Sequence, residues 1–275
     1  MTSPQIIRVP YDSGHRGLRM GAGPDVLGPA LAASSGVAPE TVELPDGFRT
    51  EAAAGFALAR TLAERVRAAH EGGRRPLVLA GNCLSSLGTT AGVAGDDLAV
   101  VWLDAHGDLE TPETSTSGFV DGMALAALMG RCWRSLAASV PGFRPLPGHR
   151  AVLVGARDLS DAERALVADA GVTWVRADAL GALAPALGAL ADSGARRVYL
   201  HVDLDVHDPA ELPVNSYPAP GGLTRAAVRD VVRQVAARFE ISAAAMTAYD
   251  PSCDPRGLVV EAVRELAPLL DRQGT

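Results

Sequence analysis

The sequence predicts a three-layer α/β/α fold with a mainly parallel central sheet, because short β-branched runs alternate with longer Ala-, Leu- and Arg-rich segments. Several of these short runs are continuously apolar, as in sheets that helices cover on both faces. The expected strands are Gln5–Val9, Pro76–Ala80, Ala99–Leu103, Ala151–Val154, Val172–Val175, Val198–Val202 and Ala244–Ala248. No repeat or linker divides the sequence, so we expect one domain over residues 1–275.

The expected helices lie between these strands and carry helix-forming residues at roughly helical spacing. They are Thr50–His70, Ser160–Ala170, Asp178–Ser193, Thr224–Phe239 and Leu258–Leu270. Ser160 to Glu163 has the pattern of a capping box, and Asp178 and Thr224 can cap the helices that they open. Pro185 lies inside the third segment, so it either kinks that helix or marks its true first turn.

The composition excludes several classes of partner. The formal net charge is −7 with no long run of Lys or Arg, so the chain lacks the basic surface that binds phosphate backbones or anionic lipid. No stretch approaches the roughly 20 apolar residues that span a bilayer, and Met1–Gln5 lacks a signal-peptide pattern. We expect no nucleic-acid or membrane partner and a cytoplasmic location. Cys83, Cys132 and Cys253 form no close pair, which argues against a disulfide framework.

Two of the expected strands run directly into acidic clusters. The first continues into Asp104, His106 and Asp108, and the second into Asp203 and Asp205. Alternate residues of an extended chain share one side, and ligands bind at the carboxyl ends of strands in open α/β sheets. Burying these groups without cations would cost on the order of several kcal/mol per unpaired ion. The clusters therefore predict bound divalent metal, with Mn²⁺ or another first-row ion favoured by oxygen and nitrogen donors. Helix caps or solvated loops are the alternative interpretation.

These clusters resemble motifs of the arginase and agmatinase (ureohydrolase) family. The stretch from Asp104 to Asp108 is similar to D-A-H-x-D, and that from Asp203 to Pro209 is similar to D-x-D-x-x-D-P. The segment Thr111 to Gly118 also resembles the loop that follows D-A-H-x-D in arginases. The resemblance implies a binuclear manganese centre bridged by Asp104, Asp108 and Asp203 and completed at one ion by His106 and Asp205. It also implies trimers or hexamers in many members, so a homo-oligomer is expected.

One metal-ligand position departs from the family pattern. The stretch Ala80-Gly81-Asn82-Cys83-Leu84 stands where the family has G-G-D-H-S, so Cys83 replaces a histidine ligand. A thiolate can ligate a divalent ion, but sulfur is softer than imidazole and biases a site toward zinc or iron. We expect Cys83 to be a ligand, with an inert neighbour of the metal as the alternative. A cysteine here also resembles the Nω-hydroxy-L-arginine amidinohydrolase of D-cycloserine biosynthesis.

The positions that resemble substrate-binding residues are also altered. The stretch Ser117 to Gly122 resembles S-G-N-x-H-G but carries Asp121 in place of the proton-shuttling His, so Asp121 either moves a proton, pairs with a cationic substrate or caps a helix. The guanidinium-binding Glu of E-x-N-P falls on Ala248, two residues before Asp250, a candidate substitute. Glu110 replaces an Asn that holds the substrate α-carboxylate and would repel that group. Glu110 therefore either holds a substrate amine or points into solvent, and Ser117 is a further candidate contact.

Together these observations predict a metal-dependent hydrolase of a non-peptide C–N bond in a guanidino or amidino compound. In this hypothesis a pair of metals activates water, Asp108 orients it and passes its proton to the leaving amine, and Asp121 is a second proton carrier. The altered positions favour a substrate such as Nω-hydroxy-L-arginine over L-arginine. Two alternatives remain open: a noncatalytic metal- or ligand-binding protein, and an amidino-group enzyme with Cys83 as nucleophile and His106 as its base.

Overall fold

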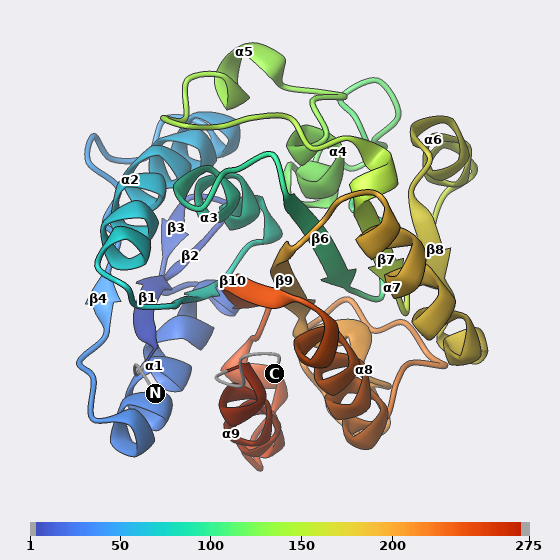
Figure 1. Ribbon diagram of the computed structural model, residues 1–275. Coiled ribbons are helices and arrows are strands. Elements are labelled where there is room, and N and C mark those ends of the chain that lie inside the picture. Colours follow the sequence, from blue (N-terminus) through green and yellow to red (C-terminus); the bar gives the residue numbers. More distant parts are fainter. Residues whose placement is uncertain (1–3, 271–275) are drawn as a thin grey trace.

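The fold is a twisted eight-stranded sheet between two layers of helices (Figure 1). The computed structural model describes residues 4–270; residues 1–3, which begin the segment considered for a targeting signal, and residues 271–275 lie outside it. The strand order is β4-β1-β5-β10-β9-β6-β7-β8, and every ladder of this sheet is parallel in the described range. The strands are β1 (Gln5–Val9), β4 (Glu40–Thr41), β5 (Pro76–Ala80), β6 (Leu98–Leu103), β7 (Ala151–Val154), β8 (Thr173–Val175), β9 (Arg197–Asp203) and β10 (Glu240–Thr247).

Helices bury both faces of the sheet. Along β6, Val100 and Trp102 face one apolar cluster, whereas Val101 and Leu103 face the other, as the alternation of an extended chain requires. The first cluster includes residues of α2 (Glu51–Glu71), α3 (Ser86–Gly92), α4 (Ala124–Leu128), α5 (Arg134–Ala137) and α6 (Asp161–Ala170). The second includes residues of α1 (Gly23–Ser35), α7 (Leu183–Asp192), α8 (Arg225–Arg238) and α9 (Leu258–Leu270). The predicted three-layer α/β/α class is therefore confirmed.

Most expected elements form within a few residues of the expected bounds. Ser160 and Glu163 make the reciprocal bonds of a capping box, and Thr224 accepts a hydrogen bond from the Ala227 amide at the start of α8. The prediction that Asp178 caps a helix is wrong, because Asp178 lies in a 3-10 segment and pairs with Arg176 instead. The α7 helix begins after that segment at Leu183, so Pro185 falls in its first turn, where proline is tolerated.

The topology gathers the candidate site at one edge of the sheet. Strands β5, β10, β9 and β6 are neighbours, and because they are parallel their carboxyl ends meet at the same edge. Cys83 follows β5, Thr247 ends β10, Asp203 ends β9 and Asp104 follows β6. A small antiparallel pair, β2 (Tyr11–Asp12) and β3 (His15–Arg16), lies beyond β1. Within residues 4–270, no helix combines the length and apolar character needed to cross a membrane.

Candidate metal centre

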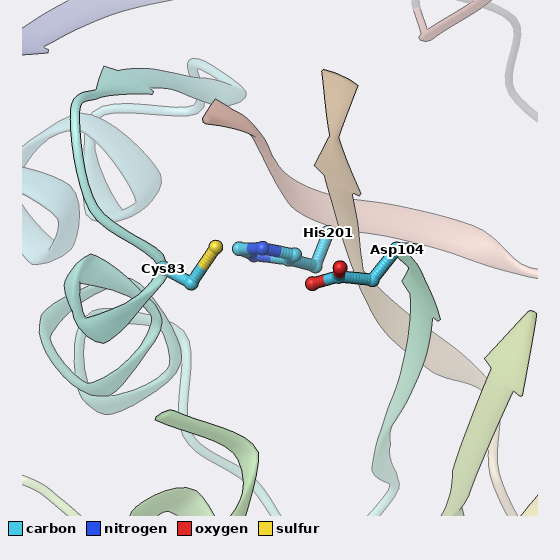
Figure 2. Close-up of side chains that lie close together, drawn as sticks. All are labelled: Cys83, Asp104 and His201. Atoms are coloured by element: carbon cyan, nitrogen blue, oxygen red, sulfur yellow. The ribbon is translucent and has the colours of Figure 1, made fainter. Parts of the chain in front are cut away.

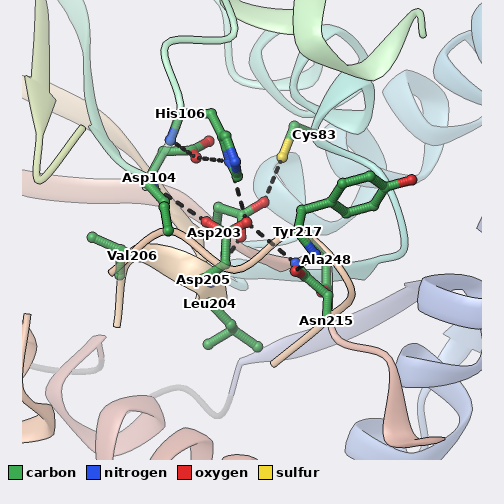
Figure 3. A network of polar contacts seen from close by, with 12 residues as sticks. Cys83, Asp104, His106, Asp203, Leu204, Asp205, Val206, Asn215, Tyr217 and Ala248 are labelled. Atoms are coloured by element: carbon green, nitrogen blue, oxygen red, sulfur yellow. Dashed lines mark hydrogen bonds and ion pairs between the residues drawn. The ribbon is translucent and has the colours of Figure 1, made fainter. Parts of the chain in front are cut away.

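The first acidic cluster forms a compact turn directly after β6. One oxygen of Asp104 accepts a hydrogen bond from the Trp102 indole at 3.0 Å, and the other accepts the His106 amide at 2.7 Å. The ring Nδ1 of His106 lies 3.4 Å from Asp104 and 3.3 Å from Oδ2 of Asp205 (Figure 3). The imidazole is therefore held between carboxylates that come from two neighbouring strands.

The second cluster completes the site from β9 and β5. Oδ1 of Asp203 accepts the Asp205 amide at 2.8 Å, and its Oδ2 accepts the thiol hydrogen of Cys83 at 3.0 Å (Figure 3). Thr247 at the end of β10 lies 3.2 Å from the same sulfur and 3.3 Å from the same carboxylate. Residues at the ends of three strands thus lie close together. The two sequence motifs predicted this convergence for the acidic residues.

Asp108 occupies a strained position beside these residues. Its φ of 51° lies in the left-handed region, which non-glycine residues adopt at a cost on the order of 1 kcal/mol or more. Its side chain is buried and lines the same pocket, and among the described residues no donor reaches its Oδ2. Such an unpaired carboxylate oxygen is suited to bind a cation.

The electrostatics of the centre support the same interpretation. Burial, with repulsion from neighbouring carboxylates, raises the pKa of Asp104 and raises those of Asp108 and Asp203 well above the ordinary value. Burial alone would lower the pKa of His106, but Asp205 and Asp104 outweigh it and raise that pKa to about 12. One imidazolium cannot neutralise this many buried carboxylates, so a donor set of oxygens, imidazole and sulfur fits divalent metal.

Several supporting residues were not predicted from the sequence. The guanidinium of Arg157 donates to the backbone carbonyls of Asp205, Val206 and His207 at 3.1 to 3.2 Å and so fixes the loop after β9. Asn215 donates to Oδ2 of Asp205 at 3.2 Å and to the Ala248 carbonyl at 3.0 Å. These contacts join segments far apart in the sequence, so no local sequence pattern predicts them.

A pocket of about 350 Å³ opens above the carboxylates. All six expected metal ligands line it: Cys83, Asp104, His106, Asp108, Asp203 and Asp205. Glu110, Asp121 and Ala248 also line it, and the stacked rings of Phe119 and Tyr217, with centroids 5.9 Å apart, form part of its wall. A volume of this size suits a ligand with the dimensions of an amino acid or a small diamine.

Two expected substrate contacts do not line this pocket. Ser117 is exposed, and its hydroxyl accepts the Phe119 amide at 3.1 Å within the loop. Asp250 was expected to share a side with Ala248 on an extended chain, but Ala248 adopts a left-handed φ of 63° and ends that extension. Asp250 instead accepts hydrogen bonds from the amide and hydroxyl of Ser252. The structure places both residues outside the lining of this pocket, and their contact with substrate stays a prediction.

Asp121 lies in the pocket wall with defined partners. One carboxylate oxygen accepts the Leu84 amide at 2.9 Å, and the other accepts the Asn82 side chain at 2.9 Å. The alternative that Asp121 caps the following helix is wrong, because its side chain makes no capping bond there. Burial raises the pKa of Asp121 to about 8, so this carboxyl group exchanges a proton near neutral pH.

Comparison with known proteins identifies the family. A family model described as the arginase family matches residues 5–268. The chain belongs to the arginase family. The arginase of Bacillus caldovelox is 35% identical over 192 residues, which span 67% of this chain and 64% of that protein. The N(omega)-hydroxy-L-arginine amidinohydrolase of Streptomyces lavendulae is 37% identical over 157 residues, or 56% of this chain and 54% of that protein. Both alignments thus cover less than two thirds of the relative.

The fold of this arginase-family chain matches solved structures over nearly its full length. The native structure of arginase from Bacillus caldovelox superposes with a TM-score of 0.88 at 27% identity and covers 99% of both chains. The formimidoylglutamase of Bacillus subtilis superposes with a TM-score of 0.79 at 19% identity, which shows a shared fold alone. The arginase resemblance predicted from the acidic motifs is confirmed.

One buried histidine of this arginase-family chain was missed at the sequence level. His201 lies on β9 two residues before Asp203, is fully buried, and falls within 4.8 Å of donor atoms of Cys83 and Asp104 (Figure 2). Its position inside an apolar strand indicates a core residue, and only the pairing of β9 with β6 and β10 brings its ring to the centre. The one sequence signal was its spacing, because His201, Asp203 and Asp205 occupy alternate positions whose side chains share one side of an extended chain.

Proposed function

We propose that this chain hydrolyses a non-peptide C–N bond of a guanidino or amidino compound with the help of divalent metal. The observation that carries this proposal is the convergence of buried carboxylates, an imidazole and a thiol in one pocket, with an orphaned oxygen on Asp108. Membership of the arginase family supports the reaction class, and the names of the curated relatives indicate guanidino substrates.

The residues that would hold metal are those that the motifs and the pocket share. Asp104, Asp108, Asp203, His106 and Asp205, with Cys83, would hold the metal. The oxygen-rich half of this set suits Mn²⁺. Two ions bound there would activate a water at neutral pH and stabilise negative charge that develops on the substrate carbon's substituents.

Two carboxyl groups of the chain are placed to move protons. The carboxylate of Asp108 lines the pocket and can accept a hydrogen bond from the attacking water, then transfer the proton to the leaving amine. Asp121, with a pKa of about 8, holds a proton at neutral pH and can donate it within the pocket. A group whose pKa lies close to the working pH is the most effective general acid or base.

The pocket wall favours a substrate that differs from free L-arginine at one end. Glu110 lines the pocket and is half-buried, so an α-carboxylate beside it would meet repulsion on the order of 1 kcal/mol or more. The same carboxylate would attract an amine, such as the α-amino group of an amino acid or the terminus of a diamine. Nω-hydroxy-L-arginine, bound with its amino group toward Glu110, is our specific substrate hypothesis, supported by the Streptomyces relative.

The structure weakens the alternative of a metal-free thiol nucleophile. Burial, reinforced by Asp203 and Asp108, raises the pKa of Cys83 well above the ordinary value, so the sulfur stays protonated without a bound cation. His106, the base that this alternative requires, makes its Nδ1 contacts with Asp104 and Asp205 instead. A neutral thiol without a base is a poor nucleophile.

The test follows amine release from several guanidino compounds. The purified chain, supplied with Mn²⁺ and Zn²⁺, is incubated with Nω-hydroxy-L-arginine, L-arginine and agmatine, and ornithine or putrescine is quantified by chromatography. We expect metal-dependent release that chelation abolishes and that Asp108→Asn lowers at least about 100-fold. Asp178→Asn, an exposed carboxylate paired with Arg176, is the matched control.

The same assay distinguishes the alternatives. Metal that binds without any amine release would favour a noncatalytic binding protein. Activity that survives chelation and is lost on thiol alkylation would favour a Cys83-dependent enzyme. Either result would overturn the proposal.

A further inference from the structure

His201, a residue outside the family motifs, lies beside the metal centre. Its ring is fully buried and stacks on Trp102 with centroids 3.6 Å apart and planes at 13°. Nδ1 lies 2.7 Å from the Tyr199 hydroxyl, and Nε2 lies 3.3 Å from the Thr247 hydroxyl. Both ring nitrogens are therefore oriented, and the ring cannot turn without losing these contacts.

The Nε2 end of the ring faces the thiol side of the centre. Thr247 contacts both Nε2 of His201 and Sγ of Cys83, and Sγ donates to Asp203 at 3.0 Å. Figure 2 shows the Cys83 sulfur and the Asp104 carboxylate beside the ring. Their ligand atoms lie within 4.8 Å of one another, and tetrahedral zinc with bonds of about 2.0 to 2.3 Å separates its donors by roughly 3.3 to 3.8 Å. Small side-chain rotations would close that gap.

The ring also has the orientation that a ligand needs, because the hydroxyl groups of Tyr199 and Thr247 contact its two nitrogens. When Nδ1–H donates to Tyr199, the lone pair of Nε2 points toward Thr247 and Cys83. A hydrogen bond of this kind to the outer nitrogen is the usual way in which proteins orient a metal-binding histidine.

We propose that His201 supplies an imidazole ligand opposite Cys83, so that Cys83, His201, Asp104 and Asp203 form a zinc-selective half of the metal centre. The inference rests on the proposed metal-dependent function and concerns the identity of one ion. The chain has lost an imidazole at the turn after β5, where the family motif has histidine, and offers one from β9 instead. Sulfur and nitrogen favour zinc over manganese, whereas the His106, Asp104 and Asp205 half is richer in oxygen.

Binding of zinc at this half displaces the thiol proton. The hydrogen that Cys83 donates to Asp203 leaves to solvent, and the thiolate, the neutral imidazole and two carboxylates then surround the ion. The centre would thus be mixed, with zinc on the β5 side and manganese on the β6 side. A protein that carries two manganese ions would lack this asymmetry.

Cobalt is a suitable probe because it occupies zinc sites and reports its ligands by absorption. The metal-depleted full chain is titrated with Co²⁺ as wild type, His201→Gln, Cys83→Ser and His207→Gln. His207 is the matched control, since it is also a buried histidine near the end of β9, but its Nδ1 bonds to the Leu204 carbonyl and it belongs to neither group of metal-binding side chains found among the described residues. Wild type should show a thiolate-to-cobalt band and the visible bands of tetrahedral Co²⁺.

The spectra and Co²⁺ affinities of the variants test whether His201 binds the metal. Cys83→Ser should lose the thiolate band, and His201→Gln should keep it while the visible bands change and the Co²⁺ affinity falls about 10-fold or more. His207→Gln should match wild type. If the His201→Gln spectrum and affinity equal those of wild type, His201 is a core residue only and the inference is wrong, even where amine release still shows a metal-dependent enzyme.

A measurement on a protein with His201 intact covers the case in which His201→Gln fails to fold. X-ray absorption of the zinc-loaded His106→Gln variant should show one sulfur at about 2.3 Å together with imidazole scattering. His106 is removed there, so His201 is the imidazole that remains near the centre among the described residues. Sulfur and oxygen without imidazole would overturn the inference.

Discussion

Replacing Asp121 by Asn should make the stability of the metal-free protein less dependent on pH and slow catalysis. Burial raises the pKa of Asp121 to about 8, even though the Leu84 amide and the Asn82 side chain donate to its carboxylate. The group is therefore mainly neutral at pH 7 in the folded protein, whereas in the unfolded chain its pKa is about 3.9 and it is charged. Asparagine keeps the shape and an acceptor for the Leu84 amide and is uncharged in both states, but it loses the acceptor for the Asn82 side chain.

The magnitude follows from the two pKa values. Because the folded pKa lies above the unfolded pKa, the folded state binds the extra proton, and stability falls as pH rises from about 4 to about 8. Each pH unit inside this window changes the free energy of unfolding by about 1.4 kcal/mol. Between pH 5 and pH 7 the wild type should thus lose about 2 to 3 kcal/mol that Asp121→Asn does not lose.

The assay is urea unfolding of both proteins in chelator at pH 5 and pH 7, followed by far-ultraviolet circular dichroism. The other carboxyl groups of the centre are present in both proteins, so the difference between the two slopes reports Asp121. With metal supplied, kcat of the variant should fall about 100-fold or more, because the proton carrier is gone. A stability difference that does not change with pH would refute the raised pKa, and an unchanged kcat would refute the proton-transfer role.

Three further changes test other parts of the structure. Glu110→Gln should lower KM for L-arginine about 5-fold, because roughly 1 kcal/mol of repulsion between the two carboxylates is lost. KM for agmatine, which has no carboxylate, should not fall. An equal fall in KM for both substrates would contradict the argument. Arg157→Lys should cost about 2 to 3 kcal/mol in urea unfolding and weaken metal binding, since lysine cannot reach all the loop carbonyls. Ser160→Ala should cost about 1 kcal/mol by removing the cap of α6, and an unchanged unfolding midpoint would count against the cap.

The strands were predictable because burial on both faces leaves a plain sequence pattern. Continuous apolar runs such as that of β6 leave little choice beyond a central parallel strand. The helix α1 was missed because Pro24 and Pro29 suggest a loop, although Pro24 lies in the first turn, where its missing amide costs nothing. The expected strand Ala244–Ala248 starts four residues after the observed start at Glu240 and ends one residue after the observed end at Thr247. The alanine side chain at position 248 gave no signal of its left-handed backbone.

Site residues could be predicted from the sequence where they lie together in a short motif. The acids after β6 and β9 lie within short motifs, so their convergence could be predicted from the strands alone. The bond between Asn82 and Asp121 joins residues 39 apart, and the contacts of His201 depend on which strands flank β9. These contacts depend on the strand order and on long-range packing, which local periodicity in the sequence does not predict.

The departures from the family motifs contact compensating partners, and this argues for a retuned site over a decayed one. Where the family motifs carry an Asp and a His, this chain has Asn82 and Asp121, and the amide of Asn82 donates to the carboxylate at 2.9 Å. The thiol of Cys83 likewise donates to Asp203 at 3.0 Å.

Loss of function removes the selection that keeps buried polar groups matched, and unmatched groups cost on the order of 1 to 3 kcal/mol each. Here Asn82 donates to Asp121 and Cys83 donates to Asp203, while an oxygen of Asp108 that lacks a partner among the described residues is available to a bound cation. Partners of this kind at the altered positions favour a site that is retained for metal binding and chemistry, in agreement with the proposed metal-dependent hydrolase.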